Sequence, residues 1–336
     1  MTPQALNKRA ESKFLVTGAQ GFIGAWVVKM LLERGDRPIV FDLSKESRRL
    51  RAVVSEEQLA NVTFIEGDVT EAASLDRTVS ERGVTHVIHL AGLQIPSCAA
   101  DPIRGGMVNV IGTLNVFEAA RRHANMVKRL VYASSAAVYG PEEAYEGGHV
   151  TENAPLLPTS HYGVFKQCNE GNARVYFNDA GISSVGLRPF TVYGVGRDFG
   201  VTSGPTKAIK AAIIGRPYTI RFTGTTNILY ARDCAEVFIH SAEVDLPGAH
   251  VYALGGAFID VEDFVKTLEA VEPRARGLIR AEGKHVPIAA DLDNSALRRD
   301  LGKVPATPLE EGIRETAMIF ARLQREGRLD VQDLEV

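Results

Sequence analysis

The chain contains little cysteine, no long apolar run and almost no net charge. Three cysteines in 336 residues, Cys98, Cys168 and Cys234, stand too far apart for a disulfide framework or a metal-ligand motif, so we expect reduced thiols and no metal site. The sequence contains no run of about 18 apolar residues, so it predicts no membrane-spanning helix. A formal net charge of −3 argues against binding to nucleic acid or to an anionic membrane. We therefore expect a cytoplasmic protein whose partner is a small-molecule substrate.

Short apolar runs alternate with amphipathic stretches over the first 190 residues. The runs are nearly continuous in apolar character, which is typical of parallel strands covered by helices on both faces. They cover residues 13–17, 38–42, 62–65, 86–91, 129–133 and 184–188. Helical periodicity follows at residues 22–34, 71–81, 107–123 and 160–180. The alternation predicts an α/β fold with a doubly wound parallel sheet of the Rossmann type.

Beyond residue 190 the pattern loosens, and glycine and proline become more frequent. Further helices are expected at residues 204–214, 231–242, 261–270, 294–301 and 308–324. We expect residues 1–190 to form a dinucleotide-binding domain, joined by strands from about residues 224–255. Residues 191–336 should form mainly a smaller C-terminal substrate lobe.

A glycine-rich turn follows the first predicted strand and opens the first predicted helix. Gly18, Gly21 and Gly24 are spaced to allow a tight turn, a close approach of the backbone to a pyrophosphate, and close packing of the helix. Asp42 ends the second predicted strand, where a carboxylate can accept both hydroxyls of an adenosine ribose and repel a 2′-phosphate. Together they predict binding of NAD. Asp68, after the third strand, either contacts the adenine amino group or caps the next helix.

Tyr162 and Lys166 stand one helical turn apart, on one face of the helix predicted at 160–180. A free phenol, with a pKa of about 10, is a poor base at neutral pH, but a nearby ammonium favours its ionised form. Ser135 follows the strand predicted at 129–133, and the carboxyl end of a parallel strand is where this fold binds ligands. The three side chains predict proton transfer at a substrate hydroxyl or carbonyl.

An ordered set of motifs carries a family resemblance over nearly the whole chain. The motifs are TGAQGFIG at 17–24, Asp42, GDV at 67–69, HLAG at 89–92, NVIGT at 109–113, SSAAVYG at 134–140, YGVFK at 162–166 and LRPFTVYG at 187–194. In this order they resemble the extended short-chain dehydrogenases/reductases of the NAD-dependent epimerase/dehydratase family.

The resemblance implies roles for individual residues. Tyr162 would be the general acid/base, Lys166 its partner and ribose anchor, Ser135 a hydrogen-bonding group for substrate, and Asn109 the fourth catalytic residue. The residues implied for NAD binding are Gly18, Gly21, Phe22, Ile23, Gly24, Asp42, Asp68, Val69, Leu90, Ala91, Gly92, Tyr162, Lys166 and Pro189. A homodimer through the helices at 107–123 and 160–180 is also implied.

The sequence departs from the family pattern at the substrate side. Dehydratases of the family carry Thr-Asp-Glu where this chain has Ser135, Ala136 and Ala137, which argues against dehydration. Nucleotide-sugar epimerases carry Asn where Thr191 stands, and they carry a diphosphate-binding Arg in the stretch corresponding to 222–228, where none is present. The residues expected to contact substrate are Gln94, Ser135, Ala136, Thr191 and Arg197.

These departures favour an NAD-dependent dehydrogenase that oxidises or reduces a secondary alcohol or ketone of a small polyhydroxylated molecule, such as a sugar or sugar acid. The alternative is a nucleotide-sugar 4-epimerase with tightly bound NAD. A third hypothesis is a non-catalytic NAD-sensing protein. A dehydrogenase produces net NADH, an epimerase converts substrate without it, and a sensor only binds.

Overall fold

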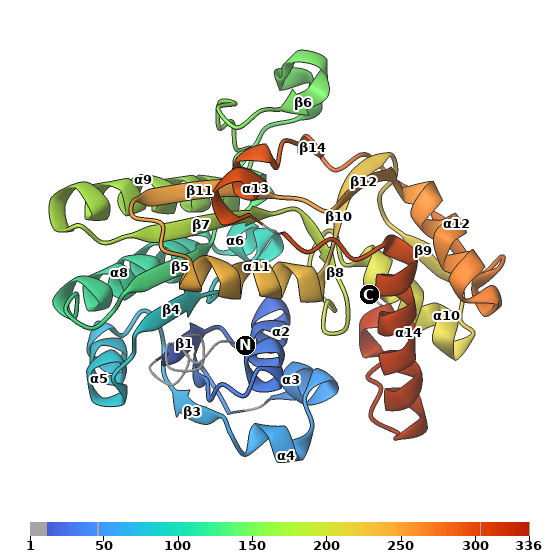
Figure 1. Cartoon of the computed structure of the whole chain (residues 1–336). Coiled ribbons are helices and arrows are strands. Elements are labelled where there is room, and N and C mark those ends of the chain that lie inside the picture. The colour runs from blue at the N-terminus through green and yellow to red at the C-terminus, as the bar shows by residue number, and fades with distance from the viewer. Residues whose placement is uncertain (1–11, 46, 303, 336) are drawn as a thin grey trace.

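The computed structural model describes residues 12–45, 47–302 and 304–335. Its centre is a seven-stranded parallel sheet in the order β11-β7-β5-β4-β1-β2-β3 (Figure 1). The strands are β1 (Phe14–Thr17), β2 (Ile39–Asp42), β3 (Thr63–Glu66), β4 (His86–His89), β5 (Arg129–Ala133), β7 (Ser184–Pro189) and β11 (Ala249–Leu254). The strand order reverses next to β1, so the doubly wound α/β fold is confirmed.

Helices cover both faces of this sheet, and alternate residues of each strand point to opposite faces. On β1, Phe14 and Val16 join a core with α2 (Phe22–Glu33) and α11 (Ala231–Glu243). Leu15 points the other way, into a second core with α5 (Ala72–Arg82), α8 (Gly112–Arg122) and α9 (His161–Ala180). Burial on both faces explains the continuous apolar runs in the sequence.

A smaller lobe follows the main sheet. Its sheet joins β8 (Thr191–Tyr193), β10 (Thr225–Tyr230) and β12 (Ala257–Asp260), and β9 (Tyr218–Ile220) pairs with β13 (Ile279–Ala281). Its helices are α10 (Gly204–Ile214), α12 (Val261–Val271), α13 (Ser295–Leu301) and α14 (Leu309–Arg325). Of the strands within 224–255, β11 extends the main sheet, whereas β10 belongs to the smaller sheet. The domain boundary near residue 190 stays a prediction.

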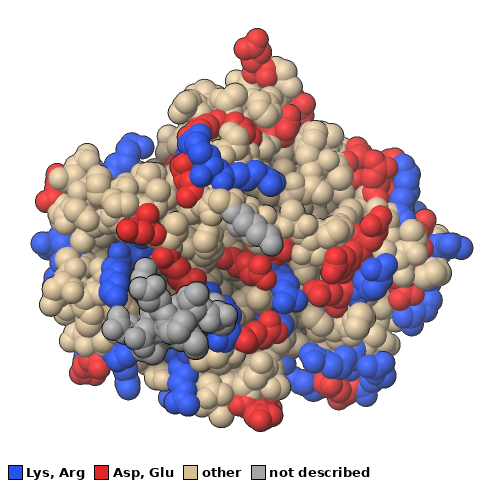
Figure 2. Space-filling view, viewed as in Figure 1, with Lys and Arg blue, Asp and Glu red and all other residues tan. Residues whose placement is uncertain are grey.

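Short elements complete the chain. They are α3 (Arg48–Val53), α4 (Glu56–Leu59), α6 (Ile95–Ala100), α7 (Pro102–Gly106) and the pair β6 (His149–Val150) with β14 (Asp291–Leu292). The segment around β6 projects from the body of the molecule (Figure 1). Basic and acidic side chains are interspersed on the face shown in Figure 2, without a large patch of one sign. No helix among the described residues has the length and apolar character needed to cross a bilayer.

The helix predicted at 107–123 differs from the observed one in its first turn. Residues Met107–Ile111 form a π-helical turn, and α8 begins only at Gly112. Asn109, in the middle of this turn, is fully buried and bonded to the backbone of Leu93 and Gly105. The wide turn directs the amide of Asn109 inward, and π-helical turns of this kind occur frequently at functional sites.

Candidate active site

One cavity of about 540 Å³ joins the glycine-rich turn to the predicted catalytic residues. It lies at the carboxyl ends of the central strands, as expected for this fold. The predicted residues that line it are Gly18, Gly21, Phe22, Ile23, Gly24, Leu90, Gly92, Gln94, Ser135, Ala136, Tyr162, Lys166, Pro189, Thr191 and Arg197. Asp42, Asp68, Val69, Ala91 and Asn109 lie outside this lining, behind or beside it.

The glycine-rich turn has the shape required for a bound pyrophosphate. Gly18 has a positive φ of 67°, and a Cβ there would lie 2.5 Å from the amide nitrogen of Ala91. A Cβ on Gly24 would lie 2.4 Å from the carbonyl oxygen of Gly18, so only glycine lets α2 pack this close to the turn. Gly21 precedes α2 and provides no side-chain cap, which leaves the first amides of the helix free to bind phosphate. The cradle therefore fits a dinucleotide.

Asp42 is held at the end of β2 by two backbone amides. One carboxylate oxygen accepts a hydrogen bond of 2.8 Å from Gln20 and the other accepts one of 2.8 Å from Leu43. Burial raises the pKa of Asp42, and these two bonds act against that rise. Asp68 accepts a bond of 2.8 Å from the amide of Thr70, which is a local turn contact. A contact from Asp68 to adenine stays a prediction.

Tyr162 and Lys166 lie in the first turns of α9, against the turn that follows β5. Ser160 caps the helix, and its hydroxyl accepts a bond of 3.2 Å from the amide of Gly163. A Cβ on Gly163 would lie 2.1 Å from the carbonyl oxygen of Ala137, so this glycine allows α9 to approach the turn closely. As a result, the phenol of Tyr162 and the hydroxyl of Ser135 line the cavity together, and hydrogen bonding from Ser135 lowers the pKa of the phenol.

Lys166 is buried beneath Tyr162 and tied to the end of β5. Its ammonium donates a bond of 2.7 Å to the carbonyl oxygen of Ala133 and lies 5.5 Å from the centre of the Tyr162 ring. Burial lowers the pKa of Lys166 to about 8. Burial raises the pKa of Tyr162, while the bond from Ser135 and the charge of Arg197 lower it. Arg197 lines the same cavity as Tyr162, so its charge acts on the phenol, an effect that the sequence did not indicate.

A buried ion pair stands behind the catalytic residues, and the sequence analysis missed it. Glu170 lies one turn after Lys166 on α9, and its carboxylate accepts bonds of 2.8 and 2.6 Å from Arg188 of β7. Ser134 donates a 2.5 Å bond to Glu170, and Arg188 donates a 2.8 Å bond to the hydroxyl of Tyr139. The pair locks α9 to the ends of β5 and β7. One sequence feature could have indicated it: Glu170 stands four residues after Lys166, so the two lie on the same face of α9.

Asn109 supports the loop beneath the cofactor site. Its side-chain amide bonds both the N–H and the carbonyl oxygen of Leu93 at 3.2 Å. Its backbone carbonyl oxygen accepts bonds from the side chains of Thr113 and Asn169. A Cβ on Gly92 would lie 2.6 Å from the Asn109 amide oxygen and 3.6 Å from the Lys166 ammonium. Asn109 therefore lies close to Lys166, across Gly92, and its role as the fourth catalytic residue stays a prediction.

The opposite side of the cavity comes from the smaller lobe. Arg197 donates bonds of 3.1 Å to the side chains of Gln94 and Thr202, and its Nε has no partner among the described residues. Thr191 is fully buried and lies 3.3 Å from the hydroxyl of Thr226, so its side chain is turned toward β10. Of these candidates, Arg197 and Gln94 are the better placed to meet a substrate.

The comparisons with known proteins agree with this geometry. A model of the "NAD dependent epimerase/dehydratase family" matches residues 14–255. The chain is 30% identical over 338 residues to a UDP-glucose 4-epimerase of Azospirillum brasilense, covering 93% of each chain. It is 29% identical to that of Bacillus subtilis, covering 88% of this chain and 93% of the relative. The structure of the Thermus thermophilus UDP-glucose 4-epimerase with NAD matches with a TM-score of 0.77 and 26% identity, covering 92% of this chain and 98% of that one.

The chain belongs to the NAD-dependent epimerase/dehydratase family, and it is an NAD-dependent enzyme. The resemblance inferred from the motifs is thereby confirmed. Between the two catalytic interpretations, the relatives named as 4-epimerases support the alternative better than the dehydrogenase that the sequence analysis preferred.

Proposed function

We propose that this protein is an NAD-dependent 4-epimerase of a nucleotide sugar. The observation that carries the proposal is the single cavity in which the glycine-rich turn, Tyr162, Ser135 and Lys166 meet. The names of the relatives that match over nearly the whole chain select epimerisation among the reactions that such a cavity supports.

The chain's own residues account for the proton transfers. When bound along the glycine-rich turn, NAD would supply reversible hydride transfer. The phenolate oxygen of Tyr162 removes the proton from the substrate hydroxyl and returns it after the sugar has presented its other face. The hydroxyl of Ser135, which lines the same cavity as Tyr162, holds the same substrate oxygen. The charge of Arg197 lowers the pKa of the phenol. The ammonium of Lys166, 5.5 Å from the centre of the Tyr162 ring, is a second positive charge that favours the ionised form.

Ala136 and Ala137 separate this reaction from dehydration. Both line the cavity next to Ser135 and bring no carboxylate that could remove the further proton needed for loss of water. Incubation with dTDP- or GDP-hexoses should therefore give no 4-keto-6-deoxy sugar, as checked by mass spectrometry.

The phosphate contacts of the nucleotide must differ from those of the family pattern. The stretch 222–228 lacks arginine. The side-chain amide of Asn227 donates to the carbonyl oxygen of Ala290 and accepts from the backbone N–H of Gly256, so it is used inside the lobe. Arg197 is a cation of this cavity, and its Nε has no partner among the described residues. In addition to its effect on Tyr162, it is therefore available to an anionic substituent of the substrate, either the diphosphate or a sugar carboxylate.

The test is incubation with NAD and UDP-glucose or UDP-glucuronate, with products separated by chromatography and NADH read by absorbance. Conversion to the 4-epimer without net NADH is expected. Stoichiometric NADH would instead support the second candidate, a dehydrogenase of a small sugar or sugar acid, which the missing arginine and the inward Thr191 favour. Binding of NAD without turnover of any of these compounds would leave the sensor hypothesis.

We further infer a homodimer through α8 and α9. Large apolar side chains are exposed along the helices of this face: Ile103, Met107, Ile111, Val164 and Val175. Light scattering should give twice the chain mass, and Val164→Glu with Val175→Glu should give the monomer. A cytoplasmic location stays a prediction from the sequence.

A further inference from the structure

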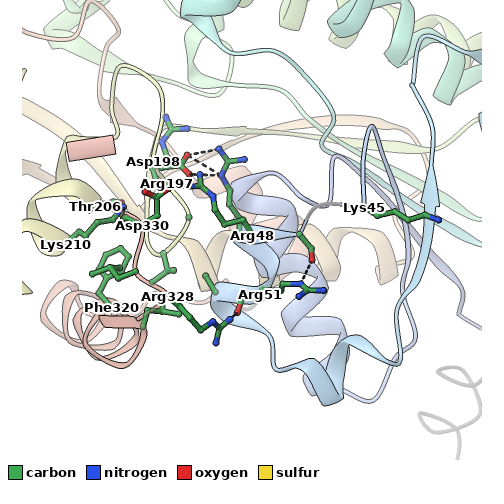
Figure 3. Close-up of a pocket in the computed structure, with 17 residues that line it drawn as sticks. Lys45, Arg48, Arg51, Arg197, Asp198, Thr206, Lys210, Phe320, Arg328 and Asp330 are labelled. Atoms are coloured by element: carbon green, nitrogen blue, oxygen red, sulfur yellow. Dashed lines mark hydrogen bonds and ion pairs between the residues drawn. The ribbon is translucent and has the colours of Figure 1, made fainter. Parts of the chain in front are cut away.

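A short loop at residues 194–198, here named the substrate loop, separates the active-site cavity from a second, basic cavity. The second cavity has a volume of about 480 Å³ and lies between α3, α10 and α14 (Figure 3). Its charged side chains include Lys45, Arg48, Arg49, Arg51, Lys210, Arg328, Asp198 and Asp330. Arg197 lines both cavities, so the substrate loop connects them.

Asp198 is bound by two arginines of α3. Arg49 donates from Nη2 to one carboxylate oxygen at 2.7 Å and from Nε to both oxygens at 3.2 and 3.1 Å. Arg48 donates a bond of 2.8 Å to the second oxygen and also pairs with Asp330 near the C-terminus. The side chain of Asp198 is only 13% exposed, so solvent screens these bonds less than those of a surface pair.

This arrangement leaves the neighbouring Arg197 without a carboxylate. Both oxygens of Asp198 are directed to α3, and the hydrogen-bond partners of Arg197 are the neutral side chains of Gln94 and Thr202. Asp198 therefore acts on Arg197 only through its nearby charge and not through a direct ion pair. The guanidinium lines the same cavity as Tyr162, and its charge lowers the pKa of the phenol. Had Asp198 paired with Arg197, much of that charge would be cancelled.

The rest of the substrate loop is fixed through its backbone. The indole of Trp26 donates a bond of 3.0 Å to the carbonyl oxygen of Val195, and Gly194 donates one of 3.0 Å to the hydroxyl of Thr206. Gly196 has a positive φ of 99°, and a Cβ there would lie 3.4 Å from Phe22 and 3.7 Å from Arg49. The loop thus rests on the helix of the glycine-rich turn, and Asp198 is its charged attachment to α3.

We propose that Asp198 is a positioning residue, which binds Arg49 and Arg48 so that Arg197 faces Tyr162 as an unpaired cation. Because α3 follows directly after the strand that carries Asp42, the same attachment connects the adenosine side of the cofactor site to the substrate side. The inference rests on the proposed role of Tyr162 as the proton-transfer residue, and it extends that role to a residue that touches neither substrate nor cofactor.

The first experiment measures the ionisation of Tyr162 in the NAD-loaded protein without any turnover. Tyrosinate absorbance is titrated in wild type and in Asp198→Asn, and each curve is corrected with the same protein carrying Tyr162→Phe. The groups that face Tyr162 are Ser135, Arg197, Cys98 and Lys166. Loss of a nearby negative charge by itself would lower the midpoint, because the phenolate would be less repelled. Displacement of Arg197 raises it, so a raised midpoint is expected, and an unchanged or lowered one overturns the proposal.

The second experiment measures kinetics with the epimerase substrate. Asp198→Asn should lower kcat/KM by about ten- to a hundredfold, since small misplacements of a catalytic group have effects of that size. Arg49→Lys keeps the charge but loses the two-pronged contact, so it should show a smaller loss in the same direction. Asp330→Asn, which removes only the other partner of Arg48, should stay within about twofold of wild type.

A double variant separates positioning from general damage. In an Arg197→Met background, Asp198→Asn should change neither kcat/KM nor the Tyr162 midpoint further, because the residue that it positions is gone. Full additivity of the two changes would refute the mechanism. If no nucleotide sugar is turned over but the midpoint still rises in Asp198→Asn, the proposed function fails while the positioning role stands.

Discussion

The two walls of the active-site cavity differ in how their polar side chains are held. On the wall from the main sheet and α9, here the sheet wall, Lys166 is bonded to Ala133 and the ion pair of Glu170 with Arg188 is fully buried. On the wall from residues 190–202 and 286–288, here the lobe wall, the Nε of Arg197 has no partner among the described residues. Two neighbouring apolar side chains, Phe199 and Val201, are 48% and 52% exposed.

This difference assigns separate tasks to the two walls. A wall whose dipoles and charges are fixed before substrate arrives can stabilise a developing charge without rearranging. A wall with free donors and exposed apolar groups gains its partners only when a ligand binds. The sheet wall therefore carries most of the groups that determine the kind of reaction. Apart from Arg197, whose charge also acts on Tyr162, the lobe wall determines which molecule undergoes it. The following predictions test this division, beginning with the largest effect.

Replacing Tyr162 with Phe removes the phenol oxygen and leaves the packing of the sheet wall in place. Turnover should fall by about 10²–10⁴-fold, as expected for loss of general acid/base catalysis. NAD binding, measured by fluorescence titration, should change little. Tyr176→Phe, on the same helix but bonded to Glu118, serves as the matched control and should keep wild-type turnover. Activity of Tyr162→Phe within a few-fold of wild type would remove Tyr162 from the mechanism.

Replacing Glu170 with Gln should damage the sheet wall through stability. The change leaves the guanidinium of Arg188 buried without a full counter-charge, and breaking one partner of a buried pair costs about 3–5 kcal/mol. Glu118→Gln weakens the more exposed pairs with Arg121 and Arg122 and keeps an acceptor for the hydroxyl of Tyr176, so it should cost less than about 1 kcal/mol. Urea unfolding of both variants measures the difference. Similar losses in the two would show that the wall is not held by this pair.

The sequence motifs predicted most of the residues of the sheet wall but not the ion pairs that hold these residues in place. The glycine-rich turn, Ser135, Tyr162 and Lys166 were found because each lies at a fixed offset from a predicted strand end or on one helix face. Glu170 with Arg188, and Asp198 with Arg49, were missed because each pair joins residues from elements whose contact depends on the completed fold.

The lobe wall was predictable only as a set of candidates. Arg197 was named for a carboxylate, yet its free charge depends on where the neighbouring Asp198 points, and sequence distance does not contain that information. Thr191 was named for substrate contact, but β8 pairs with β10 and turns its hydroxyl toward Thr226. Preference for the dehydrogenase rested on such loop positions, where insertions obscure the alignment.

Cofactor choice should depend on Asp42. Its carboxylate is fixed by the amides of Gln20 and Leu43, so a 2′-phosphate would meet a like charge that cannot move away. Such juxtaposition costs several kcal/mol, and about 1.4 kcal/mol is tenfold in affinity, so NAD should be preferred over NADP by at least about a hundredfold. Arg48 and Arg49 do not offset this, because Asp198 engages both. Titration of wild type and Asp42→Ala with each cofactor tests the claim; equal wild-type affinities would contradict it.

Two buried histidines at opposite ends of β4 should make the stability of the fold depend on pH; His89 lies beneath the glycine-rich turn and His86 beside Phe14. Burial lowers the pKa of His89 to about 3 and that of His86 to about 4. The unfolded chain binds these protons below about pH 6.5 and the folded one does not, so stability is lost as pH falls from there. Each group contributes about 1.4 kcal/mol per pH unit within its window.

The test is urea unfolding at several values between pH 4.5 and 6.5 in His89→Gln, whose amide can still bond the hydroxyls of Thr17 and Thr113. The slope of stability against pH should decrease by about one proton's contribution, with His86 unaffected. His161→Gln, an exposed histidine, is the control for removing an imidazole. An unchanged slope in His89→Gln would mean that this histidine takes up its proton without unfolding.

The smallest effect is expected on the lobe wall. Val201 lines the cavity and is half exposed, so Val201→Ser should change the free energy of unfolding by no more than about 0.5 kcal/mol. If bound substrate covers it, loss of apolar contact worth about 0.8 kcal/mol should raise KM about fourfold and leave kcat unchanged. Met318→Ser, an exposed apolar position on α14 outside the cavity, should alter neither quantity. A fall in kcat with unchanged KM would mean that Val201 takes part in catalysis, and it would contradict the division of tasks between the two walls. A change in KM alone would support that division.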